Sequence, residues 1–291
     1  MSDLEQERRA LMGLAYRMLG SWADAEDVVQ DALVRWHRHP HRESIESPQA
    51  YLTTITSRLA LDRLKSARAK REVYVGPWLP EPILHSEQLS PPGDAQSELA
   101  SDLTVALLLA LERLSPLERA AFILHDVFDT SWPEVAAALD RTEATCRKLA
   151  SRARVQIKSE RPRFRPSQEE RDRLLTAFGM AVATGDLHTP SAMLSEQAVF
   201  TADGGGVVKS ALRPILGRDR VARMLLGLQH KAQSQGETYS FEAAWLNGLP
   251  GFVLRGTARS VQTIALETSS DGLIAKIYFV SNPHKLRHLL A

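Results

Sequence analysis

The spacing of apolar residues changes along the chain, and this change constrains the possible fold more than any other feature. In the first half, apolar residues recur at helical intervals, as in Ala25, Val28, Val29 and Ala32. In the second half, short runs bounded by Gly, Asn, Pro and Ser are typical of strands. The predicted strands are Val199 to Ala202, Tyr239 to Leu246, Gly251 to Leu254, Ser260 to Thr268 and Leu273 to Val280. The sequence therefore predicts a multidomain protein, all-α first and α+β at its C-terminal end, with a curved antiparallel sheet.

One proline-containing segment divides the helical part in two, and a second separates the helical part from the C-terminal part. Residues 73–101 contain five of the chain's fifteen prolines, which favours an extended or irregular linker. Residues 161–166 predict a second hinge. We therefore expect domains at 1–72, 102–160 and 167–291, with a linker at 73–101 that carries Trp78 and Leu79. An exposed Trp-Leu pair is unfavourable, so we expect it to be docked on another part of the protein.

The composition limits the class of protein. The single cysteine, Cys146, excludes internal disulfides and any multi-cysteine metal site. The longest apolar run, Val105 to Leu111, is too short to span a bilayer. The N-terminal residues are acidic and polar, unlike a signal peptide. We expect a cytoplasmic protein with no metal and no cofactor.

The near-zero net charge of +1 conceals two basic stretches. Pro48 to Arg71 holds six basic residues and one acidic residue, and Arg141 to Arg165 holds nine basic residues and two acidic ones. Between them, Glu72 to Asp140 holds two basic and twelve acidic residues. A polyanion could bind at both basic stretches. Two solvated helix faces are the alternative explanation.

A helix-turn-helix is predicted at the second basic stretch. Ser115-Pro116-Leu117-Glu118 fits a capping box with proline at the first helical position, and Ser131-Trp132-Pro133-Glu134 repeats the capping-box pattern. The helix after Ser131 is short, and a tight Asp140-Arg141 connection leads into a basic amphipathic helix. That last helix places Cys146, Leu149, Ala153 and Ile157 on one predicted stripe. Such a helix suits the major groove of DNA.

Several motifs of the first 158 residues, taken in order, resemble the extracytoplasmic-function sigma factors of the sigma-70 family. They are Asp24-Ala25-Glu26-Asp27-Val28-Val29-Gln30-Asp31, Ala50-Tyr51-Leu52 through Leu61-Asp62-Arg63-Leu64, and Leu114-Ser115-Pro116-Leu117-Glu118-Arg119 followed by the helix-turn-helix. The resemblance implies two all-α parts, sigma domain two as a helical bundle and sigma domain four as a helix-turn-helix. It also implies promoter-specific initiation of transcription, with core RNA polymerase (β and β′ subunits) and promoter DNA as partners and no membrane.

The resemblance implies three sets of contact residues. The residues implied for polymerase binding are Asp24, Glu26, Asp27, Gln30 and Asp31. The residues implied for the −10 promoter element are Arg42, Thr54, Arg58, Arg63 and Lys65. The residues implied for the −35 element are Arg147, Lys148, Ser151 and Arg152. A basic face suits opened strands and a basic helix suits a duplex, so the chemistry agrees with the last two assignments.

The chain also resembles a subgroup of these sigma factors that carries a fused C-terminal SnoaL-like domain, an α+β cone. The resemblance rests on Gly76-Pro77-Trp78-Leu79-Pro80-Glu81-Pro82, on Asp203-Gly204-Gly205-Gly206 and on Asn282-Pro283-His284-Lys285-Leu286. It implies regulation in cis in place of a separate anti-sigma factor. The implied docking residues are Trp78, Leu79, Pro80, Asp203, Gly204, Gly205, Gly206, Asn282, Pro283 and Lys285. Two positions depart from the subgroup pattern, Val207 where a lysine is usual and His284 where an acid is usual.

The C-terminal domain has an alternative interpretation as a small-molecule enzyme or receptor, because SnoaL-like folds include such enzymes. An enzyme would need a general base, and the candidates are Asp186, His188, Asp203 and Asp219. None of them stands in a motif that pairs a base with a residue that orients it. The glycine triplet lacks the sequence of a phosphate loop, so nucleotide binding is not expected. An ordinary DNA-binding regulator would leave Met1 to Arg71 unexplained.

Overall fold

The computed structural model describes residues 2–84, 89, 102–158, 168–184, 188–257 and 260–290. The chain forms two compact units. The first comprises Met1–Val73 and His85–Arg161, and the second comprises Tyr74–Leu84 and Pro162–Ala291. The segment Tyr74–Leu84 thus leaves the helical unit and belongs with the C-terminal one. The prolines and the tryptophan of this segment are the residues from which the sequence predicts a linker with a docked Trp-Leu pair.

The first unit is helical throughout its described residues. Its elements are α1 (Ser2–Leu19), α2 (Trp22–Arg38), a 3₁₀ turn η1 (Arg42–Ser44), α3 (Pro48–Glu72), α5 (Val105–Glu112), α6 (Pro116–Phe122), a π-helical turn η3 (Ile123–Val127), α7 (Trp132–Leu139) and α8 (Glu143–Lys158). The stripe that the sequence predicts for α2 is Ala25, Val28, Val29, Ala32, Leu33 and Trp36. The first four are buried, while Leu33 and Trp36 are half-buried. Ser21 caps this helix by accepting a hydrogen bond from the Asp24 N–H.

Local capping signals fix where α6, α7 and α8 begin. Glu118 accepts hydrogen bonds from the Ser115 N–H and hydroxyl, and Glu134 does the same for Ser131. Thr142 accepts from the Thr145 N–H at the start of α8. Between α7 and α8, Asp140 adopts a left-handed conformation with φ of 52°, which makes the tight turn that the sequence predicts.

The inward face of α8 differs in detail from the predicted stripe. Its buried residues are Cys146, Ala150, Ala153 and Ile157, while Leu149 is only half-buried. In α3, Leu52, Thr56, Ser57, Ala60 and Leu64 are buried, while Ile55 and Leu59 are half-buried.

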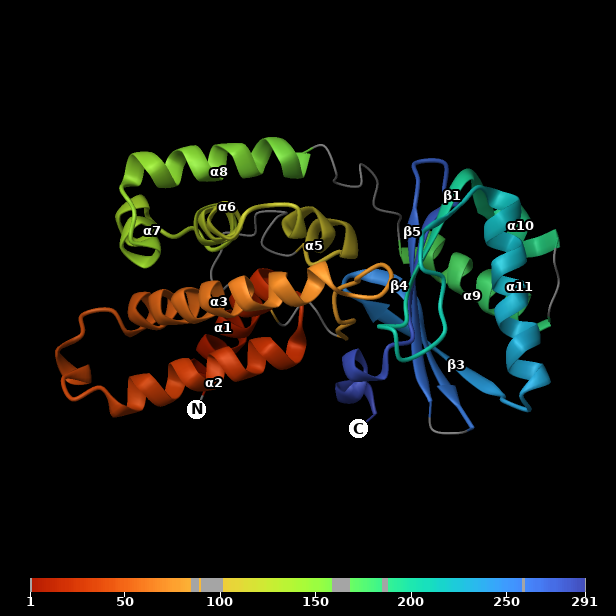
Figure 1. The fold of residues 1–291 in the computed structure, drawn as a ribbon, viewed down its shortest axis with the longest axis horizontal. Helices are drawn as coiled ribbons and strands as arrows, with labels where there is room; N and C mark the ends of the chain where they lie inside the picture. Colours follow the sequence, from red (N-terminus) through yellow and green to blue (C-terminus); the bar gives the residue numbers. More distant parts are fainter. Residues whose placement is uncertain are drawn as a thin grey trace. The chain divides into compact units, whose positions relative to one another are not determined.

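The second unit packs helices on a six-stranded sheet (Figure 1). Its elements are α9 (Gln168–Thr184), α10 (His188–Met193), β1 (Leu194–Asp203), β2 (Ile215–Leu216), α11 (Arg218–Ser234), β3 (Tyr239–Leu246), β4 (Leu249–Gly256), β5 (Val261–Thr268), β6 (Ile274–Val280), η4 (Pro283–Lys285) and η5 (Arg287–Leu289). The strand order is β2-β1-β6-β5-β4-β3. The sheet is mixed and not wholly antiparallel, because β1 pairs parallel with β6. The long connection through α11 and the β3–β5 meander makes that pairing possible.

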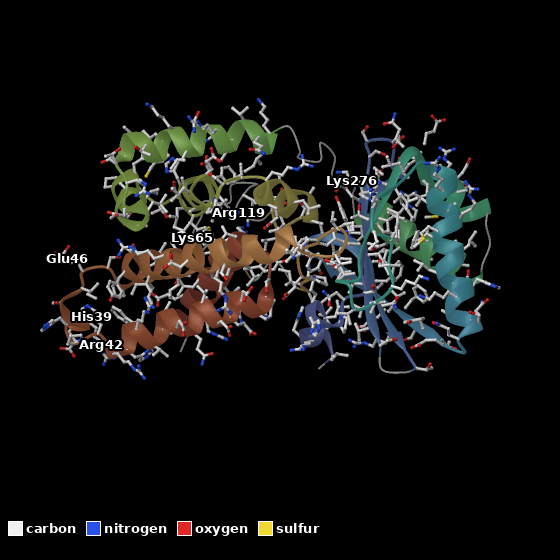
Figure 2. All side chains as sticks on the ribbon, in the orientation of Figure 1. His39, Arg42, Glu46, Lys65, Arg119 and Lys276 are labelled. Carbon is white, nitrogen blue, oxygen red and sulfur yellow. The ribbon has the colours of Figure 1, made fainter. Side chains whose placement is uncertain are left out.

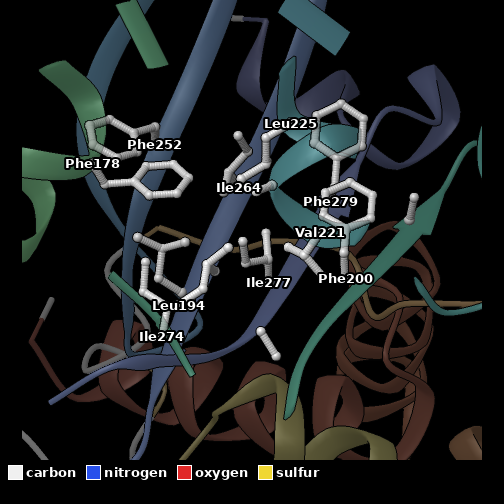
Figure 3. Close-up of a cluster of buried hydrophobic side chains, with 14 of the residues drawn as sticks. Phe178, Leu194, Phe200, Val221, Leu225, Phe252, Ile264, Ile274, Ile277 and Phe279 are labelled. Carbon is white, nitrogen blue, oxygen red and sulfur yellow. The ribbon is translucent and has the colours of Figure 1, made fainter. Parts of the chain in front are cut away.

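The core of this unit lies between the sheet and its helices. Phe178 of α9 stacks near Phe252 of β4, and Phe200 of β1 near Phe279 of β6 (Figure 3). Val221 and Leu225 of α11 complete the same cluster. This buried apolar layer holds the ends of β1 and β6 side by side, with Asp203 paired to Val280. Those ends carry the second and third subgroup motifs.

Candidate functional site: three nucleic-acid and polymerase surfaces and a docked linker

The predicted polymerase-binding residues lie on the exposed face of α2. Glu26, Asp27, Gln30 and Asp31 are exposed, and Asp24 is half-buried at the first turn. An arginine from the predicted −10 set neutralises part of this face. Arg63 donates to Asp24 Oδ1 at 2.9 Å and to Asp27 Oδ2 at 2.7 Å. The hydrogen bond to Asp24 raises the pKa of Arg63 above its ordinary value.

The predicted −10 residues do not form one continuous surface. Arg42 is exposed on η1 and Lys65 is exposed on α3, where it pairs with Asp62 (Figure 2). Thr54 is half-buried. The Arg58 guanidinium donates to the carbonyl oxygens of Ala137 at 2.7 Å and Ala138 at 3.2 Å. Arg58 therefore satisfies carbonyls in the last turn of α7, where a cation is electrostatically favoured.

An aromatic cluster next to η1 was missed at the level of sequence. Trp36 and Tyr51 have ring centroids 5.5 Å apart, and His39 contacts Tyr51 edge-on at 5.2 Å. All three are half-buried where α2 ends and α3 begins. Aromatic rings of this kind are surfaces on which unstacked bases can stack. The signal available in the sequence was the presence of aromatic residues on both sides of the loop at residues 40–46.

The predicted −35 residues share the exposed side of α8. Arg147, Lys148, Ser151 and Arg152 are all exposed. Arg147 pairs with Glu143 at 2.8 Å, and its guanidinium lies 5.4 Å from the centre of the Trp132 ring. Burial of Cys146 on the opposite side of the helix raises the pKa of its thiol. The helix thus presents a basic outer face and a packed inner one.

Two buried arginines tie the α1–α3 helices to the later part of the first unit. Arg119 of α6 donates to the Met18 carbonyl of α1 and to the Leu111 carbonyl, both at 2.7 Å, and pairs with Glu112 at 2.6 Å. Arg17 of α1 donates to the carbonyls of Gly13 and Leu89, both at 3.1 Å. Burial lowers the pKa of Arg17 to about 10, so it keeps its charge at neutral pH.

In the second unit, the segment Tyr74–Leu84 is held by a cluster of six residues that we call the docking cluster: Tyr74, Trp78, Leu79, Asp203, Asn282 and Lys285. The Asp203 carboxylate is fully buried and accepts from the Leu79 N–H at 2.8 Å, the Tyr74 hydroxyl at 2.6 Å and Lys285 Nζ at 2.7 Å. Lys285 also donates to the Leu79 carbonyl. Its ammonium lies 4.2 Å from the Trp78 ring centre and 5.0 Å from that of Tyr74.

The glycine triplet allows the docked segment to come close. Gly205 has φ of +61°, and a Cβ there would lie 2.1 Å from Asn282 Nδ2 and 3.0 Å from the Tyr74 hydroxyl. Asn282 itself donates to that hydroxyl at 2.9 Å. Burial and the hydrogen bond to Asp203 raise the pKa of Tyr74, so the hydroxyl stays protonated and donates. A side chain at position 205 would push the tyrosine and asparagine apart.

Further along the segment, docking continues through backbone contacts. Leu79, Pro80, Glu81, Pro82 and Ile83 are all buried. Ile83 and Asn247 exchange two hydrogen bonds, at 3.0 and 3.2 Å, and His288 Nε2 lies 2.7 Å from the Pro82 carbonyl oxygen. Of the residues predicted for docking, six make the contacts given above: Trp78, Leu79, Asp203, Gly205, Asn282 and Lys285. A Cβ at Gly206 would lie 3.1 Å from Val75, Pro80 and Gly204 are buried, and Pro283 is exposed.

Comparison with known proteins identifies the family. The Sigma-70 region 2 model matches residues 4–70, and the Sigma-70, region 4 model matches residues 104–157. The chain is 36% identical over 297 residues to the ECF RNA polymerase sigma factor SigJ of Mycobacterium tuberculosis, across 98% of this chain and 92% of SigJ. The chain belongs to the extracytoplasmic-function sigma factors. It is also 32% identical over 291 residues to a probable ECF sigma factor, SigI, of the same organism, across 98% of this chain and 93% of SigI.

The likeness of this sigma factor to SigJ extends over the whole fold. The crystal structure of M. tuberculosis SigJ superposes with a TM-score of 0.73 at 34% identity and covers 98% of both chains. The predicted fold class, two helical sigma domains followed by a SnoaL-like α+β domain, is confirmed. Its function as an ECF RNA polymerase sigma factor is confirmed as well.

The two departures from the subgroup pattern lie outside the buried part of the sigma factor's docking cluster. Val207 and Lys209 are exposed, and the buried ammonium comes from Lys285 instead. His284 is exposed on η4, with Nδ1 2.9 Å from Arg287 Nη2. Neither substitution removes a partner of Asp203. In the described part of the chain, none of the helices is both long and apolar enough for a membrane span.

Proposed function

We propose that this sigma factor is regulated in cis by its C-terminal domain, which holds the segment between the two promoter-reading regions. One observation carries the proposal: Tyr74–Leu84 packs with the C-terminal domain through the docking cluster, although it connects region 2 to region 4. A linker held in this way cannot extend freely. The C-terminal domain therefore restricts how far apart regions 2 and 4 can move.

Contacts inside the first unit support a closed form of the protein that opens when it binds polymerase. Arg58, proposed to contact the −10 element, is engaged with the carbonyls of α7, which belongs to the helix-turn-helix. Arg63 is engaged with Asp24 and Asp27, which we propose to contact polymerase. Promoter and polymerase contacts would have to replace these pairings. A closed form favoured by about 3 kcal/mol would leave under about 1% of the molecules open, because each 1.4 kcal/mol is a factor of ten.

Within this function we propose three interfaces. The exposed acids of α2 bind core RNA polymerase, where charge sets encounter rate and register. Arg42 and the aromatic cluster at Trp36, His39 and Tyr51, together with α3, read the opened −10 element. The exposed face of α8 reads the −35 element in the major groove through Arg147, Lys148, Ser151 and Arg152.

We further propose that the C-terminal domain has no catalytic role, so the alternative function as an enzyme is not favoured. Asp203 is fully occupied in the docking cluster. Asp219 is exposed at the start of α11, where it has no orienting base partner in the described contacts. Asp186 lies outside the described residues, and His188 begins α10. Of the described candidates, Asp203 has its oxygens committed to the docked segment and Lys285, and Asp219 is exposed to solvent, so neither is placed as a general base in an apolar site.

The experiment is reconstituted transcription with core RNA polymerase and a promoter fragment. The triple variant Arg147→Ala/Lys148→Ala/Arg152→Ala should lose promoter binding at the −35 element, because a good contact with a base edge is worth roughly 1–3 kcal/mol. A charge-matched control, Arg220→Ala/Arg223→Ala/Lys231→Ala, removes three exposed cations from α11 of the C-terminal domain. Equal loss in both triples, or none in the first, would contradict the proposed role of α8.

A further inference from the structure

A cavity of about 330 Å³ lies in the C-terminal domain between the second half of α11 and the sheet. Its base is apolar and is formed by Leu225, Leu254, Ile264 and Phe279, all of which are buried. Figure 3 shows Leu225, Ile264 and Phe279 within the core cluster that the cavity adjoins. The volume is at the lower end of the range for small-molecule sites, which are also mostly apolar.

Polar side chains gather at one end of this cavity, around the start of β3. The Tyr239 hydroxyl accepts a hydrogen bond from Gln262 Nε2 at 3.0 Å. Ser260 Oγ donates to Glu237 Oε1 at 2.8 Å and lies 3.3 Å from the Tyr239 hydroxyl oxygen. Because Gln262 already donates to Tyr239, the tyrosine proton can donate to an acceptor oxygen, either Ser260 Oγ or an oxygen of a ligand. A few convergent polar groups at one end of an apolar chamber are what orients a small ligand.

The charge of the lining excludes one class of ligand. Among the described residues that line the cavity, Glu237 carries the one formal charge, and neither lysine nor arginine is present. A carboxylate, sulfate or phosphate group would enter without a cation to pair with and would lie near Glu237. Burial of an unpaired anion is strongly unfavourable. Glu237 already accepts a hydrogen bond from Ser260, and the other lining residues are uncharged, so the lining suits an uncharged molecule.

We propose that this cavity binds a small neutral molecule with an apolar ring or chain body and a single hydroxyl or carbonyl group. The body packs on Leu225, Ile264 and Phe279, and the oxygen exchanges hydrogen bonds with Tyr239 and Gln262. None of the general-base candidates from the sequence lines the cavity in the described residues, and the proposal is for binding alone. The proposal stands independently of cis regulation and of every promoter contact.

The test uses the full-length protein and three bicyclic probes at pH 7: 2-naphthol, which is neutral with a hydroxyl, naphthalene, and 2-naphthoate, which is anionic. Isothermal titration calorimetry should show 2-naphthol binding at one site with a Kd below about 1 mM, a strength accessible to a ligand of this size. Naphthalene should bind several-fold more weakly, and 2-naphthoate at least tenfold more weakly. Tyr239→Phe should remove most of the preference of the site for 2-naphthol over naphthalene.

A pair of helix variants locates the binding. Ala232→Phe places a ring inside the cavity and should weaken 2-naphthol binding more than tenfold, whereas Ser234→Phe places the same ring on the exposed side of α11 and should leave it unchanged. Far-ultraviolet circular dichroism verifies that both variants fold. The proposal is overturned if no probe binds saturably, if 2-naphthoate binds as tightly as 2-naphthol, or if Ala232→Phe binds like the wild type.

Discussion

Substitution of Lys285 by methionine tests the docked linker most directly. Lys285 and Asp203 are 7% and 0% exposed, and their charged atoms are 2.7 Å apart. Methionine keeps most of the side-chain volume but removes the ammonium, so the Asp203 carboxylate stays buried without its cation. Loss of one partner of a buried pair costs about 3–5 kcal/mol. Release of Tyr74–Leu84 exposes Asp203 to water and relieves this cost.

The expected result is a large rise in the population of the released linker. At 1.4 kcal/mol per factor of ten, even the lower figure of about 3 kcal/mol increases that population by roughly 100-fold. The Leu79 N–H donates to Asp203 Oδ2 in the docked form and is exposed only when the linker leaves. Hydrogen exchange of the Leu79 amide, followed by NMR, should therefore accelerate about 100-fold or more in Lys285→Met.

Two further variants control this measurement. Lys276→Met makes the same substitution in the same domain, at a half-exposed lysine paired with Glu267, and should leave Leu79 exchange unchanged (Figure 2). Asp203→Asn/Lys285→Met removes both charges, while the single asparagine oxygen can still accept from the Leu79 N–H and the asparagine NH2 group faces the Tyr74 hydroxyl oxygen. It should recover most of the lost protection. The reasoning is refuted if Leu79 in Lys285→Met exchanges as slowly as in the wild type while the domain remains folded.

Three other predictions follow from single contacts. Gly205→Ala should accelerate hydrogen exchange of the linker amides more than Gly236→Ala does. Both glycines have positive φ, but a Cβ at position 205 would meet Asn282, whereas one at position 236 would meet nothing within 4 Å. Equal effects of the two substitutions would contradict the argument from close approach. Arg119→Met should lower the free energy of unfolding by about 3–5 kcal/mol in urea, since Glu112 and two carbonyls lose their buried donor, and a change under about 1 kcal/mol would rule this out. Charge reversal at Asp24, Asp27 and Asp31 of α2 should weaken assembly with core polymerase, measured by gel filtration. Charge reversal at Glu169, Glu170 and Asp172 of α9 is the control and should leave assembly unchanged.

The elements that the sequence predicted well depend on local signals. The two Ser-x-x-Glu capping boxes located the starts of α6 and α7, and alternation located β3, β5 and β6 to within a residue or two. The elements that it underestimated depend on distant partners. β1 is ten residues long where four were predicted, because the parallel ladder with β6 extends it. β2 has two residues and pairs only with β1, and it left no periodic signal to detect.

The candidate site divides in the same way. The exposure of Arg147, Lys148, Ser151 and Arg152 follows from the helical period of α8. The subgroup motifs include Trp78, Leu79 and Asp203, which lie together in the docking cluster. The engagement of Arg63 with α2 and of Arg58 with α7 could not be read from spacing, because the partners are 36 to 80 residues apart in sequence. The cavity beside α11 was also invisible, since it is the space left between a helix and strands that meet only in the folded domain.

Local signals in the sequence predict where several helices begin, which of their faces are apolar, and that a proline-rich segment with a tryptophan separates two helical regions. These are properties of residues a few positions apart, where capping, helical period and proline geometry act. Which charges are paired with one another and which stay exposed for a partner is seen only in the folded protein. Asp203, Lys285 and Tyr74 are spread over more than 200 residues, yet they make one buried cluster. A charged group is stable in the interior only when a partner of opposite charge is buried beside it, and the packing of the whole domain brings the two together.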